Sequence, residues 1–206
     1  MWRSRVDGRT NEAGMLSADE QARAARFRFD DDRTRWVAAR IFLRTVLARY
    51  LAADPTQLTF EGSARERPRL SGPSQSGWLH FSLTHSGDLS LVAVARDRDV
   101  GVDVEVVRPN RDLRAIARRV LGNATAEALD ALSAQDRVGG FYRAWVRHEA
   151  RGKCLGRGLV EPDDHQDKPS PPVVDLELEA PYVGAVAVRD RVGRFRHWTT
   201  ELQDVP

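Results

Sequence analysis

The sequence has little of what would indicate an exported, membrane-spanning or disulfide-built protein. It contains a single cysteine, Cys154, so no intrachain disulfide can form. It has no apolar run of about 18 residues, the length that a membrane-spanning helix needs, and its mean hydropathy is -0.49. The N-terminal segment MWRSRVDGRT lacks the apolar stretch of a secretory signal. We therefore expect a cytoplasmic protein that does not enter a membrane.

The sequence also lacks a strong excess of charge of one sign. Its 32 basic and 30 acidic residues leave a formal net charge of +2, which does not indicate a nucleic-acid-binding protein. Lys153 and Lys168 are its lysines, and all other basic residues except the histidines are arginines. A codon preference for arginine explains this bias, and so does a need to clamp phosphates. Composition leaves both explanations open.

The chain of 206 residues is long enough for one compact domain or two small fused halves. Its first half begins with helical patterns. Helices are predicted over residues 17–29, beginning at Ser17, and over 33–51, with Asp30 to Asp32 as its cap. The second helix carries an apolar stripe at spacings of three and four, which predicts a buried face. The stripe consists of Trp36, Ala39, Leu43, Val46, Leu47 and Tyr50.

Period-two patterns over residues 89–95 and 100–107 predict two strands, joined as a hairpin by the charged turn 96–99. The second half then repeats the order of helices followed by strands. Its predicted helices cover 113–120, 125–132 and 138–154, and its predicted strands cover 173–178, 184–188 and 195–202. We therefore expect an α+β fold built as a pseudo-twofold pair of similar halves, residues 1–96 and 97–206. Each half is expected to be a small antiparallel sheet packed with helices.

The strand Val100 to Val107 carries the first candidate site. Asp103 and Glu105 share one face of this strand, while the alternating valines share the other. Two carboxylates spaced by about 7 Å along one face repel each other, and such oxygen ligands suit Mg²⁺ together with water and substrate phosphates. In isolation, the pattern is more typical of an ordinary strand side that faces solvent.

The helix predicted over 138–154 carries a second candidate site. Glu149 and Lys153 lie one turn apart on the face that also holds Tyr142 and Val146. A surface ion pair explains the acid and the lysine. However, Gly152 between them costs the helix about 1 kcal/mol relative to alanine, which a close approach of something bulky would explain.

A third candidate is the segment His80 to Gly87, where polar residues precede a predicted strand. His85 lies beside two hydroxyls, which indicates a phosphate or ribose contact, although a histidine in a turn is more often structural. Ser82 or Ser86 with His85 would also suit a hydrolase pair, but the G-x-S-x-G turn of such enzymes is missing.

Taken together, these blocks resemble the 4′-phosphopantetheinyl transferases, specifically those of the surfactin type. The resemblance rests on F-S-L-T-H-S (81–86), G-V-D-V-E (101–105), W-V-R-H-E-A-R-G-K (145–153) and the following G-R-G-L (156–159). It covers about residues 17–160. It implies transfer of 4′-phosphopantetheine from coenzyme A to a serine of an acyl or peptidyl carrier protein, with Mg²⁺ required and adenosine 3′,5′-bisphosphate released.

The resemblance also implies a role for individual residues. Asp103, Glu105 and Glu149 match the metal ligands, and Lys153 matches a lysine that contacts coenzyme A phosphates. Thr84 and His85 align with a pair near the 3′-phosphate and adenosine, while Arg35 and Arg67 occupy positions for further phosphate contacts. Either Glu149 or Glu105 would take the proton from the carrier serine, and sequence does not choose between them.

Two departures from the family pattern concern the metal and phosphate site. His148 stands where the family usually has lysine, and Arg67 replaces the usual lysine of a G-K-P motif. A protonated His148 would keep the charge, or the change would lower activity. The prediction is therefore a monomeric transferase that serves carrier proteins of polyketide, peptide or fatty-acid synthases. The alternative is a degenerate module that binds coenzyme A or a carrier with little turnover.

Overall fold

A computed structural model provides the structure of the protein. It describes residues 1–5, 13–62, 68–109, 113–156, 170–189, 196 and 198–199. The predicted site residue Arg67 and most of the proline-rich stretch 161–172 lie outside the described residues.

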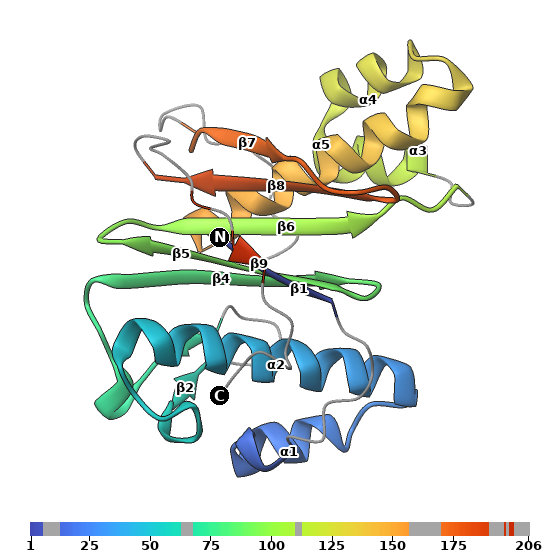
Figure 1. The fold of residues 1–206 in the computed structure, drawn as a ribbon. Helices are drawn as coiled ribbons and strands as arrows, with labels where there is room; N and C mark the ends of the chain where they lie inside the picture. The colour runs from blue at the N-terminus through green and yellow to red at the C-terminus, as the bar shows by residue number, and fades with distance from the viewer. Residues whose placement is uncertain are drawn as a thin grey trace.

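Two sheets of corresponding strand order form the centre of the molecule (Figure 1). The first has the order β4-β5-β1-β9 and consists of β1 (Trp2–Arg5), β4 (Leu79–Ser86), β5 (Leu89–Arg96) and β9 (Trp198–Thr199). The second has the order β6-β8-β7 and consists of β6 (Val100–Val106), β7 (Val173–Leu176) and β8 (Tyr182–Val188). The first strand of each half pairs antiparallel with a later strand of the same half, β1 with β5 and β6 with β8. Strand β9, from the predicted strand 195–202 of the second half, instead joins the first sheet and pairs parallel with β1. The predicted α+β fold with two similar halves is confirmed.

Each half also contains a helix of 22 residues, α2 (Asp30–Leu51) in the first and α5 (Ala134–Leu155) in the second. The shorter elements include α1 (Ala18–Ala24), β2 (Phe60–Glu61), β3 (Arg69–Leu70), α3 (Leu113–Ile116), a π-helical turn (Ala117–Leu121) and α4 (Asn123–Asp130). Figure 1 places α2 on one side of the first sheet and β6 on the other. None of the described helices is long and apolar enough to cross a membrane.

The predicted hairpin of residues 89–95 and 100–107 is wrong. These residues form β5 and β6, which belong to different sheets, and β5 instead pairs with β4 across the turn after Ser86. The sequence pattern did not predict β4, because Ser82, Thr84 and Ser86 are polar although they are buried or half-buried. They face β6 rather than solvent, so the chain crosses from one sheet to the other between β5 and β6.

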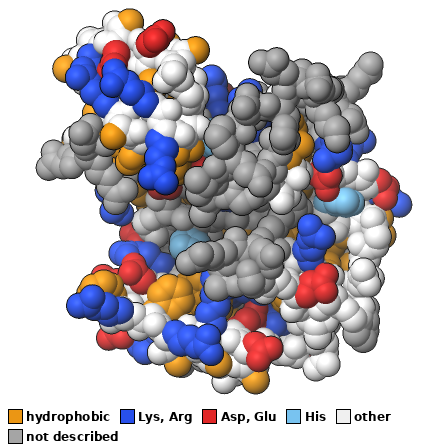
Figure 2. Space-filling view, turned by 180° about the vertical axis from the view of Figure 1, so that it is seen from behind, with side chains coloured by type: hydrophobic (Ala, Val, Ile, Leu, Met, Phe, Trp, Pro, Cys, Tyr) orange, Lys and Arg blue, Asp and Glu red, His pale blue; other side chains and the backbone are white. Residues whose placement is uncertain are grey.

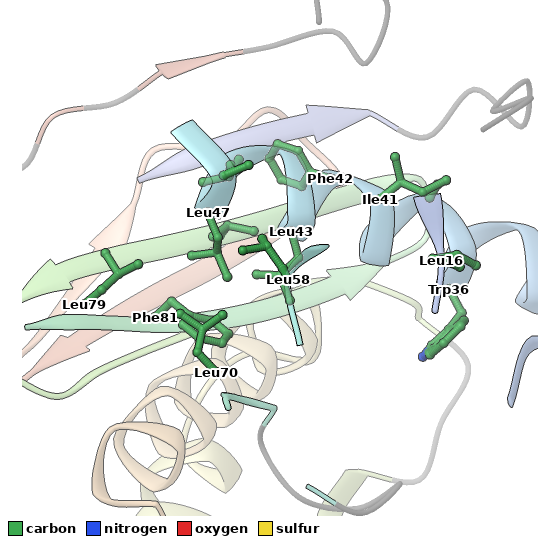
Figure 3. Packing of buried hydrophobic residues seen from close by; sticks show 14 of the residues in the cluster. Leu16, Trp36, Ile41, Phe42, Leu43, Leu47, Leu58, Leu70, Leu79 and Phe81 are labelled. Carbon is green, nitrogen blue, oxygen red and sulfur yellow. The ribbon is translucent and has the colours of Figure 1, made fainter. Parts of the chain in front are cut away.

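The first core lies between α2 and one face of the first sheet. Leu43 and Leu47 of α2 point toward Leu79 and Phe81 of β4 (Figure 3). The predicted stripe of α2 is buried except for Tyr50, which is half-buried. The helix is in fact covered on almost every side, because α1 packs against its other flank.

Two arginines of α2 enter this core, and both pair with Glu20 of α1. The Arg44 guanidinium lies 2.7 Å from a Glu20 carboxylate oxygen, and Arg40 binds the other oxygen of that carboxylate. Arg44 also donates to the carbonyl of Leu58 at 2.9 Å. A buried charge is tolerated only when it is paired and hydrogen-bonded. The Glu20 pair therefore fixes α1 against α2.

The second core joins the halves and brings α5 close to β6. Val100, Val102 and Val104 pack toward Leu89 and Leu91 of β5. On the opposite face, a row of small residues faces α5, and this row consists of Gly101, Ala185 and Ala187. A methyl group built on Gly101 would overlap the carbonyl oxygen of Ala150 and the amide nitrogen of Cys154. Glycine is therefore required on β6 for α5 to lie this close.

We expect Gly101→Ala to lower the free energy of unfolding by at least about 2 kcal/mol, because backbone atoms of α5 cannot yield as a flexible side chain can. Urea unfolding measures this change. Gly152→Ala is the matched control, since the described residues place no heavy atom within 4 Å of its missing Cβ. That control should raise stability by up to about 1 kcal/mol, and an unchanged Gly101→Ala variant would contradict the close approach.

Candidate functional site

The carboxylates of β6 lie on the face of the strand that holds Gly101, toward α5. Asp103 is 5% exposed and Glu105 is half-buried. They are therefore not on an ordinary solvent-facing strand side, which the isolated sequence pattern favoured. Burial of two acids two residues apart needs a cation or hydrogen-bond donors nearby.

Helix α5 supplies both a cation and a third acid. Lys153 donates to Asp103 Oδ1 at 2.7 Å and to the carbonyl of Val102 at 3.1 Å. Glu149 lies one turn earlier on α5 and is 6% exposed. The ion pair of Lys153 is thus made with β6 and not with Glu149, its neighbour along the helix.

Strand β4 contributes hydroxyl groups from the other half of the protein. The Thr84 hydroxyl donates to Asp103 Oδ1 at 3.0 Å. The Ser86 hydroxyl donates to Glu105 Oε2 at 2.7 Å. Each carboxylate of β6 therefore has a hydroxyl donor from β4, and the site spans the boundary between the two sheets.

Burial and mutual repulsion raise the pKa values of two of the three carboxyls. Burial, followed by the charge of Asp103, raises the pKa of Glu149 to about 7. Burial is also the largest cause that raises the pKa of Glu105, and Asp103 adds to it, although the Ser86 hydroxyl opposes the shift. Lys153 lowers the pKa of both groups. The three acids and the lysine therefore form one electrostatic cluster.

His85 lies at the end of β4, between this cluster and α2. Its side chain is exposed, although nearby protein atoms displace part of the water around the imidazole. This desolvation is the largest cause that lowers the pKa of the imidazole, and the charges of Lys153 and Arg35 lower it further. Arg35 itself lies 3.4 Å from Asp88 in the β4–β5 turn and 3.6 Å from Asp32. The three predicted phosphate contacts, His85, Arg35 and Lys153, therefore lie close enough for their charges to interact.

Two buried carboxylate oxygens suit a divalent cation. Within the described part of the chain, Asp103 Oδ2 and Glu149 Oε1 are buried and have no hydrogen-bond partner. Hard carboxylate oxygens are ligands that Mg²⁺ prefers, so the donor set fits this ion. The side chains do not surround a preformed metal position: the described residues include no group of three or more acids, histidines or cysteines arranged to hold a metal. Lys153 compensates part of the acidic charge.

A cavity of about 310 Å³ opens next to Glu105. Ser86 and Glu105 form its polar side, and Arg108 lies at the same wall. Its other walls are apolar and consist of Val106, Leu113, Ile116, Phe141, Tyr142 and Trp145. This volume lies at the lower end of the range of small-molecule pockets. The cavity can therefore take a slender, mostly apolar chain whose polar end reaches the carboxylates.

The structure brings together most of the residues that the sequence singled out. Asp103, Glu105, Glu149, Lys153 and Thr84 form one cluster, with His85 and Arg35 beside it. Sequence reasoning missed two contributions. Ser86 was considered only as a hydrolase nucleophile, although its alternation with Ser82 and Thr84 indicated a polar strand face. Gly101 was not singled out. The glycine that drew attention, Gly152, has no heavy atom of the described residues within 4 Å of where its Cβ would be.

Comparison with known proteins gives a consistent result along the chain. Residues 1–97 match a family described as 4′-phosphopantetheinyl transferase, N-terminal, and residues 99–203 match the 4′-phosphopantetheinyl transferase superfamily. The chain is 34% identical to the 4′-phosphopantetheinyl transferase HetI of Nostoc over 91% of its own length and 86% of that protein.

Two further relatives are matched over smaller shares. The chain is 30% identical to a putative 4′-phosphopantetheinyl transferase, slr0495 of Synechocystis, over 75% of its own length and 65% of that protein. It is 31% identical to the 4′-phosphopantetheinyl transferase psf-1 of Bacillus pumilus, over 70% of its own length and 59% of that protein. The chain thus spans less than two thirds of these two relatives.

We expect Glu149→Gln to stabilise the protein at pH 8 by about 1–3 kcal/mol relative to the wild type. Between about pH 4.5 and 7, the folded wild type retains a proton on Glu149 that the unfolded chain has released. At pH 8 both states are largely ionised, and the folded state bears the cost of a buried carboxylate, which the neutral Gln side chain would not have. Wild-type stability contributed by this group is therefore present near pH 4.5 and is lost as the pH rises toward 7. Urea unfolding with EDTA at pH 5 and pH 8 measures the difference.

A control variant for this measurement is Glu177→Gln, which changes an exposed carboxylate. It should alter stability by less than about 0.5 kcal/mol at either pH. A Glu149→Gln variant that is no more stable than the wild type at pH 8 would show that burial does not oppose ionisation of Glu149.

Proposed function

Because the chain belongs to the 4′-phosphopantetheinyl transferase superfamily, whose reaction moves 4′-phosphopantetheine from coenzyme A to a carrier protein, we propose that the cluster on β6 and α5 is its active site. Asp103, Glu105 and Glu149 would hold a magnesium ion. The observation that carries this proposal is a pair of buried oxygens, one of Asp103 and one of Glu149, that have no hydrogen-bond partner among the described residues. Both belong to one cluster that also contains Lys153.

Magnesium, when bound, would neutralise charge on the pyrophosphate and make its phosphorus more electrophilic. The chain's own residues supply the remaining functions. Lys153 would turn from Asp103 to a phosphate oxygen and hold the charge that develops on the leaving bisphosphate. Its side chain is long and carries a mobile point charge, which suits this movement.

The proposed step forms one bond and breaks one. The carrier serine oxygen bonds to the phosphorus that bears the pantetheine, and the bond from that phosphorus to the bridging oxygen breaks. Adenosine 3′,5′-bisphosphate leaves with that oxygen. The serine proton passes to a carboxylate of the site, and we assign this role of general base to Glu149. Glu105 is the second candidate base.

The adenosine end of coenzyme A would lie toward α2. His85 and Arg35 are the described residues that we assign to its 3′-phosphate region, with Arg67 as a further contact. The neighbouring Thr84 donates its hydroxyl to Asp103 instead. The charges of Arg35 and Lys153 both lower the pKa of the His85 imidazole, and a region that is positive in this way supports an anion there. His148 would carry the charge that lysine carries in relatives.

The cavity beside Glu105 would hold the pantetheine chain. Its apolar walls suit the dimethyl and methylene groups, and Ser86 and Arg108 offer polar atoms to the chain's amides. The phosphate end of that chain would then lie at Glu105, where the transfer takes place.

The proposed partner is an acyl or peptidyl carrier protein with an acidic helical surface. Figure 2 shows basic side chains gathered over the α3–α4 end of the molecule. Arg114, Arg118 and Arg119 are exposed there, and the first two both form ion pairs with Asp130.

We assign the enzyme to the surfactin type, acting as a cytoplasmic monomer whose two halves meet between residues 96 and 97. The alternative is a module that binds coenzyme A or a carrier without turnover.

Transfer is tested by incubating the full chain with apo-carrier, coenzyme A and Mg²⁺. We expect the carrier to gain about 340 Da, the mass of one phosphopantetheine group. Asp103→Ala and Glu149→Ala should reduce the rate by at least about a hundredfold, whereas Glu177→Ala, which removes an exposed acid, should not. Coenzyme A binding by the wild type without this mass gain would favour the binding module. Full activity in Asp103→Ala would contradict the assigned metal site.

Filling the cavity tests the pantetheine assignment. Ile116→Trp adds bulk at the cavity wall and should raise the KM for coenzyme A about tenfold or more, because the pantetheine chain loses its space. Ala115→Trp adds the same ring at the exposed neighbouring position and should leave the KM unchanged. Steady-state kinetics over a range of coenzyme A concentrations measures both. Equal KM values in the two variants would contradict the assignment.

A further inference from the structure

The hydroxyl row of β4, which we define as Ser82, Thr84 and Ser86, attaches this strand to β6. These residues alternate along the strand and therefore share one face. Ser82 Oγ accepts a hydrogen bond from the amide of Val102 at 3.2 Å, and Ser86 Oγ accepts one from the amide of Val106 at 3.1 Å. Since β4 and β6 belong to different sheets, side-chain hydroxyls here replace the backbone pairing of a continuous sheet.

Two members of the row also donate to the acids of the site. Thr84 donates to Asp103 Oδ1 at 3.0 Å and Ser86 donates to Glu105 Oε2 at 2.7 Å. The Ser86 hydroxyl has one proton, and its oxygen already accepts from Val106. Its proton is therefore committed to Glu105, which fixes the direction of the hydrogen bond.

This arrangement determines which carboxylate oxygen remains available. Asp103 Oδ1 receives both Thr84 and Lys153, while Asp103 Oδ2 is buried and has no partner among the described residues. A donor fixed on one oxygen restricts rotation of the carboxylate and turns the second oxygen toward the place where a ligand can bind. Groups that hydrogen-bond to metal ligands act in this way in other sites.

We propose that Thr84 and Ser86 are positioning residues, through which the N-terminal half orients the carboxylates Asp103 and Glu105 of the C-terminal half for a divalent cation. The proposal rests on the proposed function, because it takes those carboxylates as the metal ligands. It adds that cation binding depends on the strand that carries His85, so docking of the two halves and formation of the metal site are coupled.

Ser82 separates positioning from simple attachment. It lies on the same face of the same strand and is buried, but its hydroxyl binds only the Val102 amide among the described contacts. Loss of the Ser82 hydroxyl removes one attachment between the halves without touching either acid. Ser86 lines the cavity, so water can reach the Val106 amide when its hydroxyl is removed, and we expect that variant to fold.

The experiment measures binding of Mn²⁺ to the full chain without coenzyme A, from the electron paramagnetic resonance signal of free Mn²⁺. Ser86→Ala should raise the dissociation constant about 10- to 100-fold, and Ser86→Thr, which keeps the hydroxyl, should restore it. Ser82→Ala should lower the unfolding midpoint and leave the Mn²⁺ affinity unchanged. Thr84→Val, which keeps the shape and removes the hydroxyl, provides a second independent variant with the same expected loss.

Transfer kinetics add a readout that a general loss of stability would not produce. In Ser86→Ala, the Mn²⁺ concentration that gives half-maximal activity should rise, and saturating Mn²⁺ should restore most of kcat, because all three acids are still present. Wild-type affinity in both Ser86→Ala and Thr84→Val would overturn the inference, as would an equal loss in Ser82→Ala. Absence of transfer by the wild type would instead overturn the proposed function, so the two failures can be distinguished.

Discussion

The close contact between α5 and β6 is the constraint on which the rest of the site depends. Gly101 leaves no room for a side chain against the backbone of α5, and the alanines of β8 continue the same flat surface. A helix that lies this near to a strand brings the Lys153 ammonium within 2.7 Å of Asp103. Packing of small residues therefore determines the position of the charged ones, because a larger residue on β6 would separate the two elements.

The same contact places acidic side chains where their repulsion and partial desolvation are unfavourable, and the rest of the fold does not fully compensate for this. Three acids share a small, partly desolvated region, and the pKa of Glu149 rises to about 7 as a result. Two carboxylate oxygens there have no partner among the described residues. Folded proteins retain such groups mainly at functional sites, where a ligand or cation completes them. Lys153 and the β4 hydroxyls reduce the cost, and neither removes it.

Much of the fold was predictable, for identifiable reasons. The apolar stripe of α2 and the helical pattern of α5 depend on local periodicity, which the sequence displays directly. The β5–β6 hairpin was not predicted correctly, because alternation indicates a strand and does not say which strand is its neighbour. Strand β4 escaped notice because its polar side is buried against β6, and polar residues on one face normally indicate solvent.

For the site, the sequence by itself determined the chemistry that is available: two acids on one face of a strand, an acid and a lysine one turn apart on a helix, and a histidine beside hydroxyls. The tertiary structure alone decided that Lys153 pairs with Asp103 rather than with Glu149, and that Ser86 binds Glu105. Residue spacing fixes which side chains share a face of one element. The contacts between elements depend on how closely they pack, and here that closeness is set by Gly101 and by the hydroxyls that join the two halves.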